Sequence, residues 1–104
     1  MAAPYNPPKK GEDFFIYVAL SDMSTPGSLK SNPTIASGDF KISKDGGAFA
    51  NLATLPAVTP ASGIGVQIQL SATEMNADNV LVYWVDQTSP KEWADGWISI
   101  PTTA

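Results

Sequence analysis

Residues 63–85 read GIGVQIQLSATEMNADNVLVYWV, and this stretch decides the class of fold. In its first part, Val66, Ile68 and Leu70 alternate with two glutamines, which is the two-residue period of a strand with one buried and one hydrated face. Residues 80–85 are apolar at every position and rich in β-branched and aromatic types, which is typical of a central strand covered on both faces. We therefore expect Val66, Ile68, Leu70 and Val82 to be buried, and Gln67 and Gln69 to be exposed.

A short corner joins these two strands. Ser71 is followed three residues later by Glu74, which is the pattern of a capping box and predicts at most one turn of helix. Asn76, Asp78 and Asn79 then favour a turn, because Asn and Asp side chains hydrogen-bond to nearby backbone. A strand, a capped corner and a buried strand together predict an all-β sandwich.

Further strands are predicted on both sides of this unit. Residues 13–20, DFFIYVAL, present two apolar faces, and residues 97–100 form the last strand. In residues 39–52, apolar positions flank Asp45-Gly46-Gly47, which predicts a hairpin because these residues tolerate positive φ. A long loop covers residues 21–38, with a candidate short edge strand at 34–36. We expect six or seven strands in two antiparallel sheets, an immunoglobulin-like sandwich over residues 13–104.

Residues 1–12 are predicted to form an extended, proline-rich arm. Pro4, Pro7 and Pro8 cannot donate a backbone hydrogen bond, and they favour extended backbone in the residues before them. A stiff arm that carries Tyr5 loses less entropy on docking than a flexible tail. The alternatives are an arm that contacts a partner and a frayed terminus. For a contacting arm, deletion of residues 1–12 should leave the melting temperature nearly unchanged and weaken binding.

The composition argues against several classes of function. The chain of 104 residues has room for one core and carries a net charge of −4. It contains no cysteine, histidine or arginine, so it lacks thiol chemistry, the commonest general base and the commonest transition-metal ligand. Without a basic cluster or a long apolar segment, neither nucleic acid nor a membrane is expected as a partner. No signal peptide is recognisable at the N-terminus, and we expect a complete, soluble protein made in the cytoplasm.

Candidate chemistry rests on the carboxylates and the tryptophans. No pair of the ten carboxylates is marked as facing another across a cleft, so we expect no glycosidase and no other enzyme. A structural calcium ion at turn aspartates is the open alternative to a metal-free domain, although the D-x-[DN]-x-[DN]-G pattern is absent. No catalytic, cofactor-binding or metal-binding residue is predicted. Trp93 and Trp97 either line a sugar platform or pack at one end of the sandwich.

The supply of apolar residues exceeds what one core needs. Residues 14–20 and 80–85 are apolar on both faces, but a sandwich of six or seven strands has a single interior. Part of this set should therefore form an exposed patch, and such patches usually mark partner surfaces. The residues concerned are Phe15, Tyr17, Leu81, Tyr83 and Val85.

The run DFKISKDGGAFANLA, followed by V-x-I-x-L-S-A-T-E-M-N-A-D-N-V-L-V, resembles a module found in the virion proteins of tailed bacteriophages. The resemblance covers residues 39–85, with its elements at 44–49, 66–74 and 77–82. It implies an immunoglobulin-like fold and a structural role in the virion. Proteins of this kind serve as head decoration (cement) proteins or as adaptor modules of tails and fibres.

The resemblance, together with the single domain and its arm, favours a decoration protein on the capsid exterior. Its partners would be the major capsid protein and neighbouring copies of itself. The alternative is a tail or fibre module that binds a receptor or a carbohydrate. The predicted partner-binding residues are Pro4, Tyr5, Pro7, Pro8, Phe15, Tyr17, Tyr83, Trp93 and Trp97.

Overall fold

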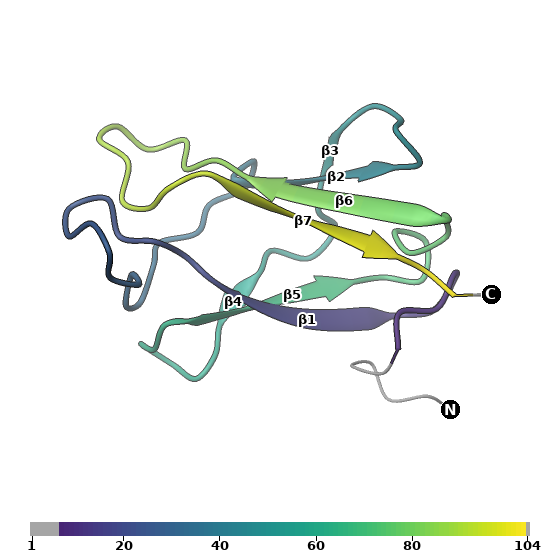
Figure 1. Cartoon of the computed structure of the whole chain (residues 1–104), viewed down its shortest axis with the longest axis horizontal. Coiled ribbons are helices and arrows are strands. Elements are labelled where there is room, and N and C mark those ends of the chain that lie inside the picture. Colours follow the sequence, from purple (N-terminus) through teal and green to yellow (C-terminus); the bar gives the residue numbers. More distant parts are fainter. Residues whose placement is uncertain (1–6, 104) are drawn as a thin grey trace.

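The computed structural model describes residues 7–103, which form a sandwich of two antiparallel sheets without a helix (Figure 1). The three-stranded sheet has the order β1 (Phe14–Ala19), β5 (Gly65–Leu70), β4 (Ala57–Val58). The four-stranded sheet has the order β3 (Ala50–Asn51), β2 (Phe40–Lys44), β6 (Asn79–Trp84), β7 (Gly96–Pro101). The predicted all-β sandwich is confirmed, whereas its immunoglobulin-like connectivity stays a prediction.

The core lies between the central strands β5 and β6. Their inward side chains are almost completely buried, as the alternation predicts: Val66, Ile68, Leu70, Val80 and Val82. The prediction that Gln67 is exposed is wrong, because only 9% of this residue is accessible. Its amide donates a hydrogen bond to the Tyr17 hydroxyl (3.2 Å) and accepts one from Gln69 (2.7 Å), so neighbours on the outer face of the sheet cover it. Gln69 is partly exposed.

The corner between β5 and β6 is the predicted capping box. The Glu74 N–H donates to Ser71 Oγ (3.2 Å), and the Ser71 N–H donates to Glu74 Oε1 (2.9 Å). The Met75 N–H closes the single turn on the Ser71 carbonyl (2.9 Å). Glu74 Oε2 also accepts from the Ala53 N–H (2.9 Å), so this corner is tied to the segment that crosses between the sheets.

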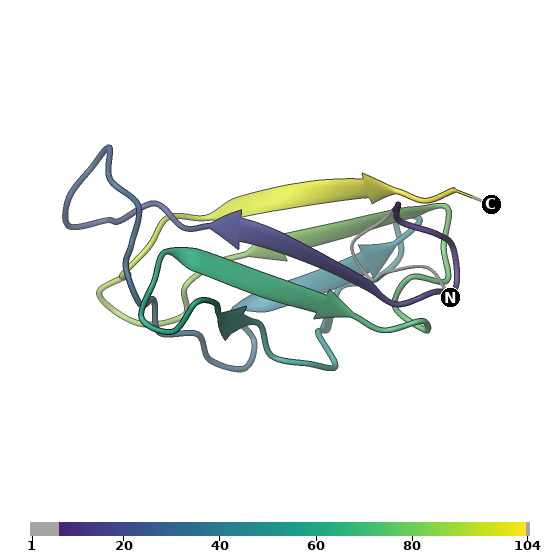
Figure 2. The same ribbon diagram turned by 90° about the horizontal axis from the view of Figure 1, so that it is seen from below.

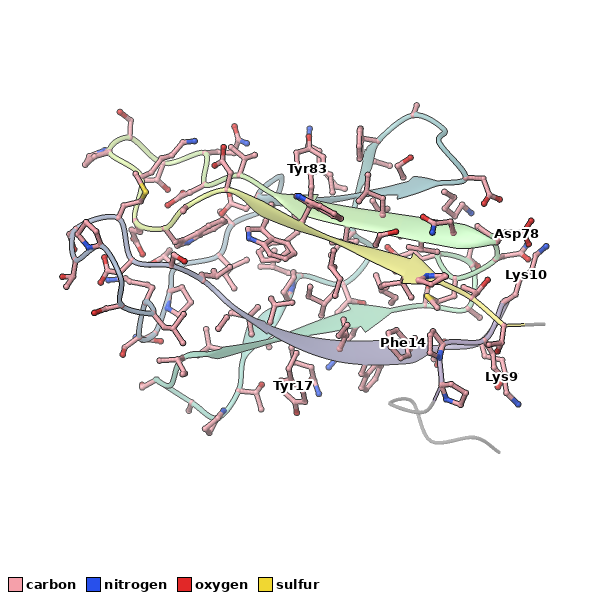
Figure 3. The ribbon with its side chains drawn as sticks, in the orientation of Figure 1. Lys9, Lys10, Phe14, Tyr17, Asp78 and Tyr83 are labelled. Carbon is pink, nitrogen blue, oxygen red and sulfur yellow. The ribbon has the colours of Figure 1, made fainter. Side chains whose placement is uncertain are left out.

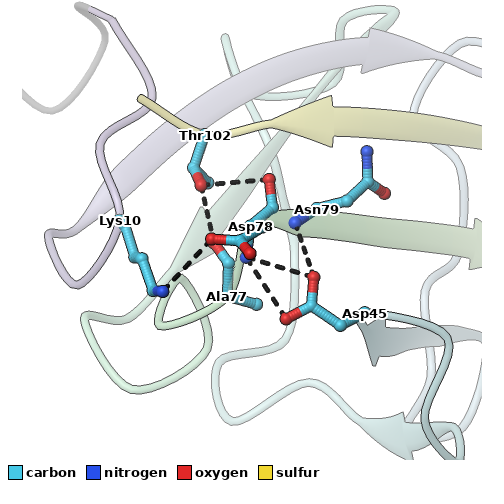
Figure 4. A network of polar contacts seen from close by, with 6 residues as sticks. All are labelled: Lys10, Asp45, Ala77, Asp78, Asn79 and Thr102. Carbon is cyan, nitrogen blue, oxygen red and sulfur yellow. Dashed lines mark hydrogen bonds and ion pairs between the residues drawn. The ribbon is translucent and has the colours of Figure 1, made fainter. Parts of the chain in front are cut away.

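The hairpin turn between β2 and β3 is also confirmed. Asp45 and Gly46 both have positive φ, 50° and 78°, and the Gly47 N–H donates to the Lys44 carbonyl (2.9 Å). These are the features of a type I′ turn, whose twist matches that of the flanking strands. The Asp45 carboxylate then accepts from the backbone N–H groups of Asp78 (3.1 Å) and Asn79 (2.9 Å), which joins the hairpin to the start of β6 (Figure 4).

One end of the sandwich is closed by two loops, residues 20–39 and 85–95. The candidate edge strand at 34–36 is not formed; isolated bridges join Ser21 to Leu29 and Asp22 to Trp93 instead. Trp93 has no accessible surface, and its indole N–H donates to the Thr34 carbonyl (3.3 Å). The long loop is therefore held by the other loop and by this tryptophan rather than by a sheet.

The second half of the predicted arm lies against the domain. The Lys10 N–H donates to the Thr103 carbonyl (2.9 Å), and the Thr103 N–H donates to the Pro8 carbonyl (2.8 Å). The Gly11 N–H donates to the Met75 carbonyl (3.0 Å), and Lys10 Nζ lies 3.1 Å from Asp78 Oδ1 (Figure 4). Residues 8–11 are thus anchored beside the last strand and do not form a free arm.

Candidate partner-binding surface

Tyrosines mark the two outer faces of the sandwich. Tyr17 on β1 and Tyr83 on β6 project from opposite sides of the molecule (Figure 3). Each is flanked along its strand by inward-facing apolar residues, because successive side chains of a strand point to opposite faces. The two apolar faces seen in each sequence segment therefore correspond to one core-facing row and one outward row.

The outer face of the four-stranded sheet carries three neighbouring aromatic residues, Phe49, Tyr83 and Trp97, which we call the aromatic row. Trp97 lies directly opposite Tyr83 in the β6–β7 register. The ring of Phe49 meets that of Tyr83 edge-on, with centroids 4.6 Å apart. Trp97 is 68% exposed and Phe49 is 48% exposed. The sheet thus presents a continuous aromatic surface to solvent.

Polar groups border the aromatic row. Lys41 lies opposite Tyr83 on the β2 side. On the β7 side, the Ser99 hydroxyl donates to Asn79 Oδ1 (3.2 Å), and a Lys91–Asp95 ion pair (2.9 Å) precedes the strand. An apolar centre with a polar border is the usual organisation of a protein-binding surface.

The outer face of the three-stranded sheet is more polar. Phe15 and Tyr17 lie opposite Gln69 and Gln67, and the Tyr17 hydroxyl is engaged by the Gln67 amide. Phe15 is partly buried and Tyr17 is 48% exposed. This face mixes aromatic rings with amides, whereas the opposite face gathers three rings.

The structure distributes the predicted partner-binding residues unevenly. Tyr83 and Trp97 come together in the aromatic row, while Phe15 and Tyr17 lie on the other face. The prediction that Trp93 binds a partner is wrong, because this residue is fully buried at the loop end of the sandwich. The centroid of its ring lies 5.9 Å from that of Phe40. Pro7 is exposed, and Pro8 is partly buried, with its carbonyl accepting from the Thr103 N–H. Pro4 and Tyr5 lie outside the described residues.

Sequence reasoning missed Phe49 as a surface residue. The residue follows the Asp-Gly-Gly turn and was expected to continue the apolar pattern of the hairpin. The second strand of the hairpin begins only at Ala50, and Phe49 precedes it over the outer face against Tyr83. The sequence indicates the length of the turn, but this length does not specify on which face of the sheet the ring of Phe49 lies.

Three buried carboxylates hold loops together. Each accepts hydrogen bonds from two backbone N–H groups: Asp39 from Ala36 and Gln87, Glu74 from Ser71 and Ala53, Asp86 from Thr88 and Glu92. Burial acts to raise the pKa of Asp86, but the N–H groups of Glu92 and Thr88 outweigh it and hold that pKa below its ordinary value. At the surface, hydrogen bonds from Ser24 lower the pKa of Asp22. These contacts give the carboxylates structural roles.

Other site types find little support in residues 7–103. Within that range, no three His, Cys, Asp or Glu residues are grouped so that they could hold a metal ion. A hollow of about 150 Å³ lies beside Leu52, Leu55 and Pro56, which is smaller than typical small-molecule pockets. No helix in this part of the chain has the length and apolar character to cross a membrane. The aromatic row is the candidate site because its rings adjoin one another and two of them are exposed.

Comparison with known protein families, characterised proteins and solved structures finds no match for this chain. The fold and the surface describe the class: a small antiparallel β-sandwich whose four-stranded sheet carries the aromatic row on its outer face.

Proposed function

We propose that this protein is a structural component of a tailed-phage virion, a decoration protein that docks on the outer surface of the capsid lattice through the aromatic row. The observation that carries the docking role is the row itself. Trp97 is 68% exposed and directly adjoins Tyr83, which in turn adjoins Phe49. Contiguous exposed aromatic surface on a small domain usually marks a partner surface. The virion assignment is supported by the resemblance of residues 39–85 to phage modules.

The chemistry of the row suits a protein partner. Trp and Tyr are the residues that most often dominate binding energy at protein interfaces, because they bury large areas and have few torsions to order. The row lies on a hydrogen-bonded sheet, so little backbone ordering would accompany docking. Lys41 and the Lys91–Asp95 pair at its border supply charges that could orient the partner.

A receptor- or carbohydrate-binding module of a tail or fibre is the second candidate. The observation that favours it is the exposed indole of Trp97, since the flat face of an aromatic ring also suits the apolar face of a sugar. In that case Trp97 would act with Tyr83 and without Trp93, which is buried.

The test is binding to capsids that lack the protein. Trp97→Ala is expected to lower occupancy at a fixed concentration, with an affinity loss of about tenfold or more, because the change removes the most exposed member of the row. Leu29→Ala, at an exposed apolar residue outside the row (47%), is the control and should bind as the unmodified protein does. Occupancy is measured by cosedimentation and cryo-EM.

Equal binding of the two variants would contradict docking through the row. Absence of binding by the unmodified protein would contradict the decoration role. A glycan array and intact tails would then test the second candidate, in which Trp97→Ala should abolish sugar binding.

A further inference from the structure

Among residues 7–103, no strand pairs with the outer side of β7, which is the edge strand of the four-stranded sheet. It ends the order β3-β2-β6-β7, and Figure 2 shows it along one side of the sandwich with β6 as its sheet neighbour. Its sequence, GWISIP, contains no charged residue, whereas soluble proteins usually guard long edges with charges, bulges or very short strands. The opposite edge, β3, is only two residues long.

The register shows which backbone groups of β7 point outward. The Thr102 N–H donates to the Asp78 carbonyl (3.0 Å), which extends the β6–β7 ladder. Because bonded pairs recur at every second residue of an antiparallel ladder, Ile100 and Ile98 are bonded to β6. The N–H and C=O groups of Trp97 and Ser99 therefore face away from the sheet, and no residue within 7–103 bonds to them.

Two further observations agree with this open edge. Pro101 has no N–H, and the same alternation places it at an outward position, where an edge strand tolerates proline. Ile98 faces inward but is only partly buried, whereas its neighbours Val80 and Val82 are completely buried. The edge thus leaves both backbone groups and apolar surface without cover from the described chain.

We propose that β7 pairs antiparallel with β7 of a second copy of this protein, about a twofold axis at Ile98. Trp97 then lies opposite Ser99 of the second copy, and Ile98 lies opposite its own equivalent. The outward N–H and C=O groups of Trp97 and Ser99 become the bonded pairs of the new ladder. On the outer face of the joined sheet, the large Trp97 side chain of each copy lies opposite the small Ser99 side chain of the other, so the two edges are self-complementary.

The local features of the edge favour a second copy over a long strand from another protein. The Lys9–Thr103 bridge occupies the edge beyond Pro101, so a long partner strand would collide with residues 8–11. The free edge is short, and its two outward residues, Trp97 and Ser99, lie one on each side of Ile98. It is also uncharged, so two copies bring no like charges together along the strands.

This pairing is independent of the proposed capsid role. It would place the aromatic rows of two copies side by side in one continuous sheet. Two joined rows would bind a repetitive surface more tightly than one, because the second contact becomes intramolecular.

The experiment is sedimentation equilibrium of the isolated full-length protein over a wide range of concentration. The unmodified protein and the control Ser99→Thr should form a weak, concentration-dependent dimer. Ser99→Pro removes an outward N–H and leaves the backbone bonds between β7 and β6 intact, so the dimer dissociation constant should rise about tenfold or more. It also removes the hydroxyl bond to Asn79, which lies within one copy. Circular dichroism and melting verify that both variants are folded.

Hydrogen exchange of the unmodified protein gives a second readout that needs no variant. The amides of Trp97 and Ser99 should become protected as concentration rises, while that of Ile98 is protected throughout by its bond to β6. A protein that stays monomeric up to about 1 mM would overturn the proposal, as would a dimer without protection at Trp97 and Ser99. A protein that stays monomeric and still binds capsids would overturn the pairing and leave the proposed capsid role standing.

Discussion

Gly96 lies directly opposite Trp84 in the β6–β7 register, and the indole of Trp84 occupies the space that a side chain at position 96 would need. A Cβ atom there would overlap the Nε1, Cε2 and Cζ2 atoms of the ring. Trp84 is buried and packs against Phe40 with ring centroids 5.5 Å apart, so the indole has little freedom to move.

Gly96→Ala is therefore expected to destabilise the domain by about 1–3 kcal/mol, the usual cost of overpacking. Urea unfolding measures the free energy of unfolding of both proteins. In a Trp84→Leu background, which removes all three of these ring atoms, the same change should cost less. Equal costs in the two backgrounds would show that the overlap is not the cause.

The second prediction compares Ile68 in the core with Gln67, which is buried on the outer face of the same strand. Ile68→Ala should lower the free energy of unfolding by about 2–5 kcal/mol, because it leaves a cavity in the core. Gln67→Ala should cost about 1 kcal/mol, since it removes hydrogen bonds to Tyr17 and Gln69. A cost near zero would mean that the amide contributes nothing, and a cost equal to that of Ile68→Ala would contradict the strand register.

The depressed pKa of Asp86 predicts acid sensitivity. A carboxylate whose folded pKa lies below its unfolded value contributes stability above the unfolded pKa, near 3.8, and loses it as the pH falls through the folded value. The free energy of unfolding should therefore decrease below about pH 4. Asp86→Asn should flatten this decrease and also cost about 1–3 kcal/mol at neutral pH, because one amide oxygen replaces two acceptors. Urea titrations from pH 2.5 to 7 measure both effects. If Asp86→Asn loses as much stability at low pH as the unmodified protein, a group other than Asp86 causes the acid sensitivity.

The anchoring of residues 8–11 changes the expectation for truncation. Deletion of residues 1–12 removes the backbone bonds to Thr103 and Met75, so the melting temperature should fall by several degrees rather than stay unchanged. Deletion of residues 1–6 keeps those bonds and is the variant that tests whether the N-terminal segment binds a capsid. Scanning calorimetry compares the two truncations. Equal melting temperatures would show that the bonds at Thr103 and Met75 add no stability.

Much of the architecture follows from short-range sequence signals. The alternation at Val66, Ile68 and Leu70 identifies a half-buried strand, and the Ser71–Glu74 spacing identifies its corner. The Asp45-Gly46 pair identifies the hairpin turn, because few residues tolerate positive φ at two consecutive positions. Each of these signals depends on residues only a few positions apart, so it can be recognised without knowing which distant segments pack against them.

The candidate surface depends on contacts between distant segments. Trp93 and Trp97 are four residues apart in one segment, yet the first is buried and the second is the most exposed large apolar residue described. Trp93 is covered because Thr34 and Phe40, more than fifty positions away, close around it, while Trp97 falls on the outward side of an edge strand. Sequence alone determined that strands would form and which faces would alternate. The tertiary structure decided which apolar face became core and which stayed on the surface, because burial depends on what the other segments bring to each position.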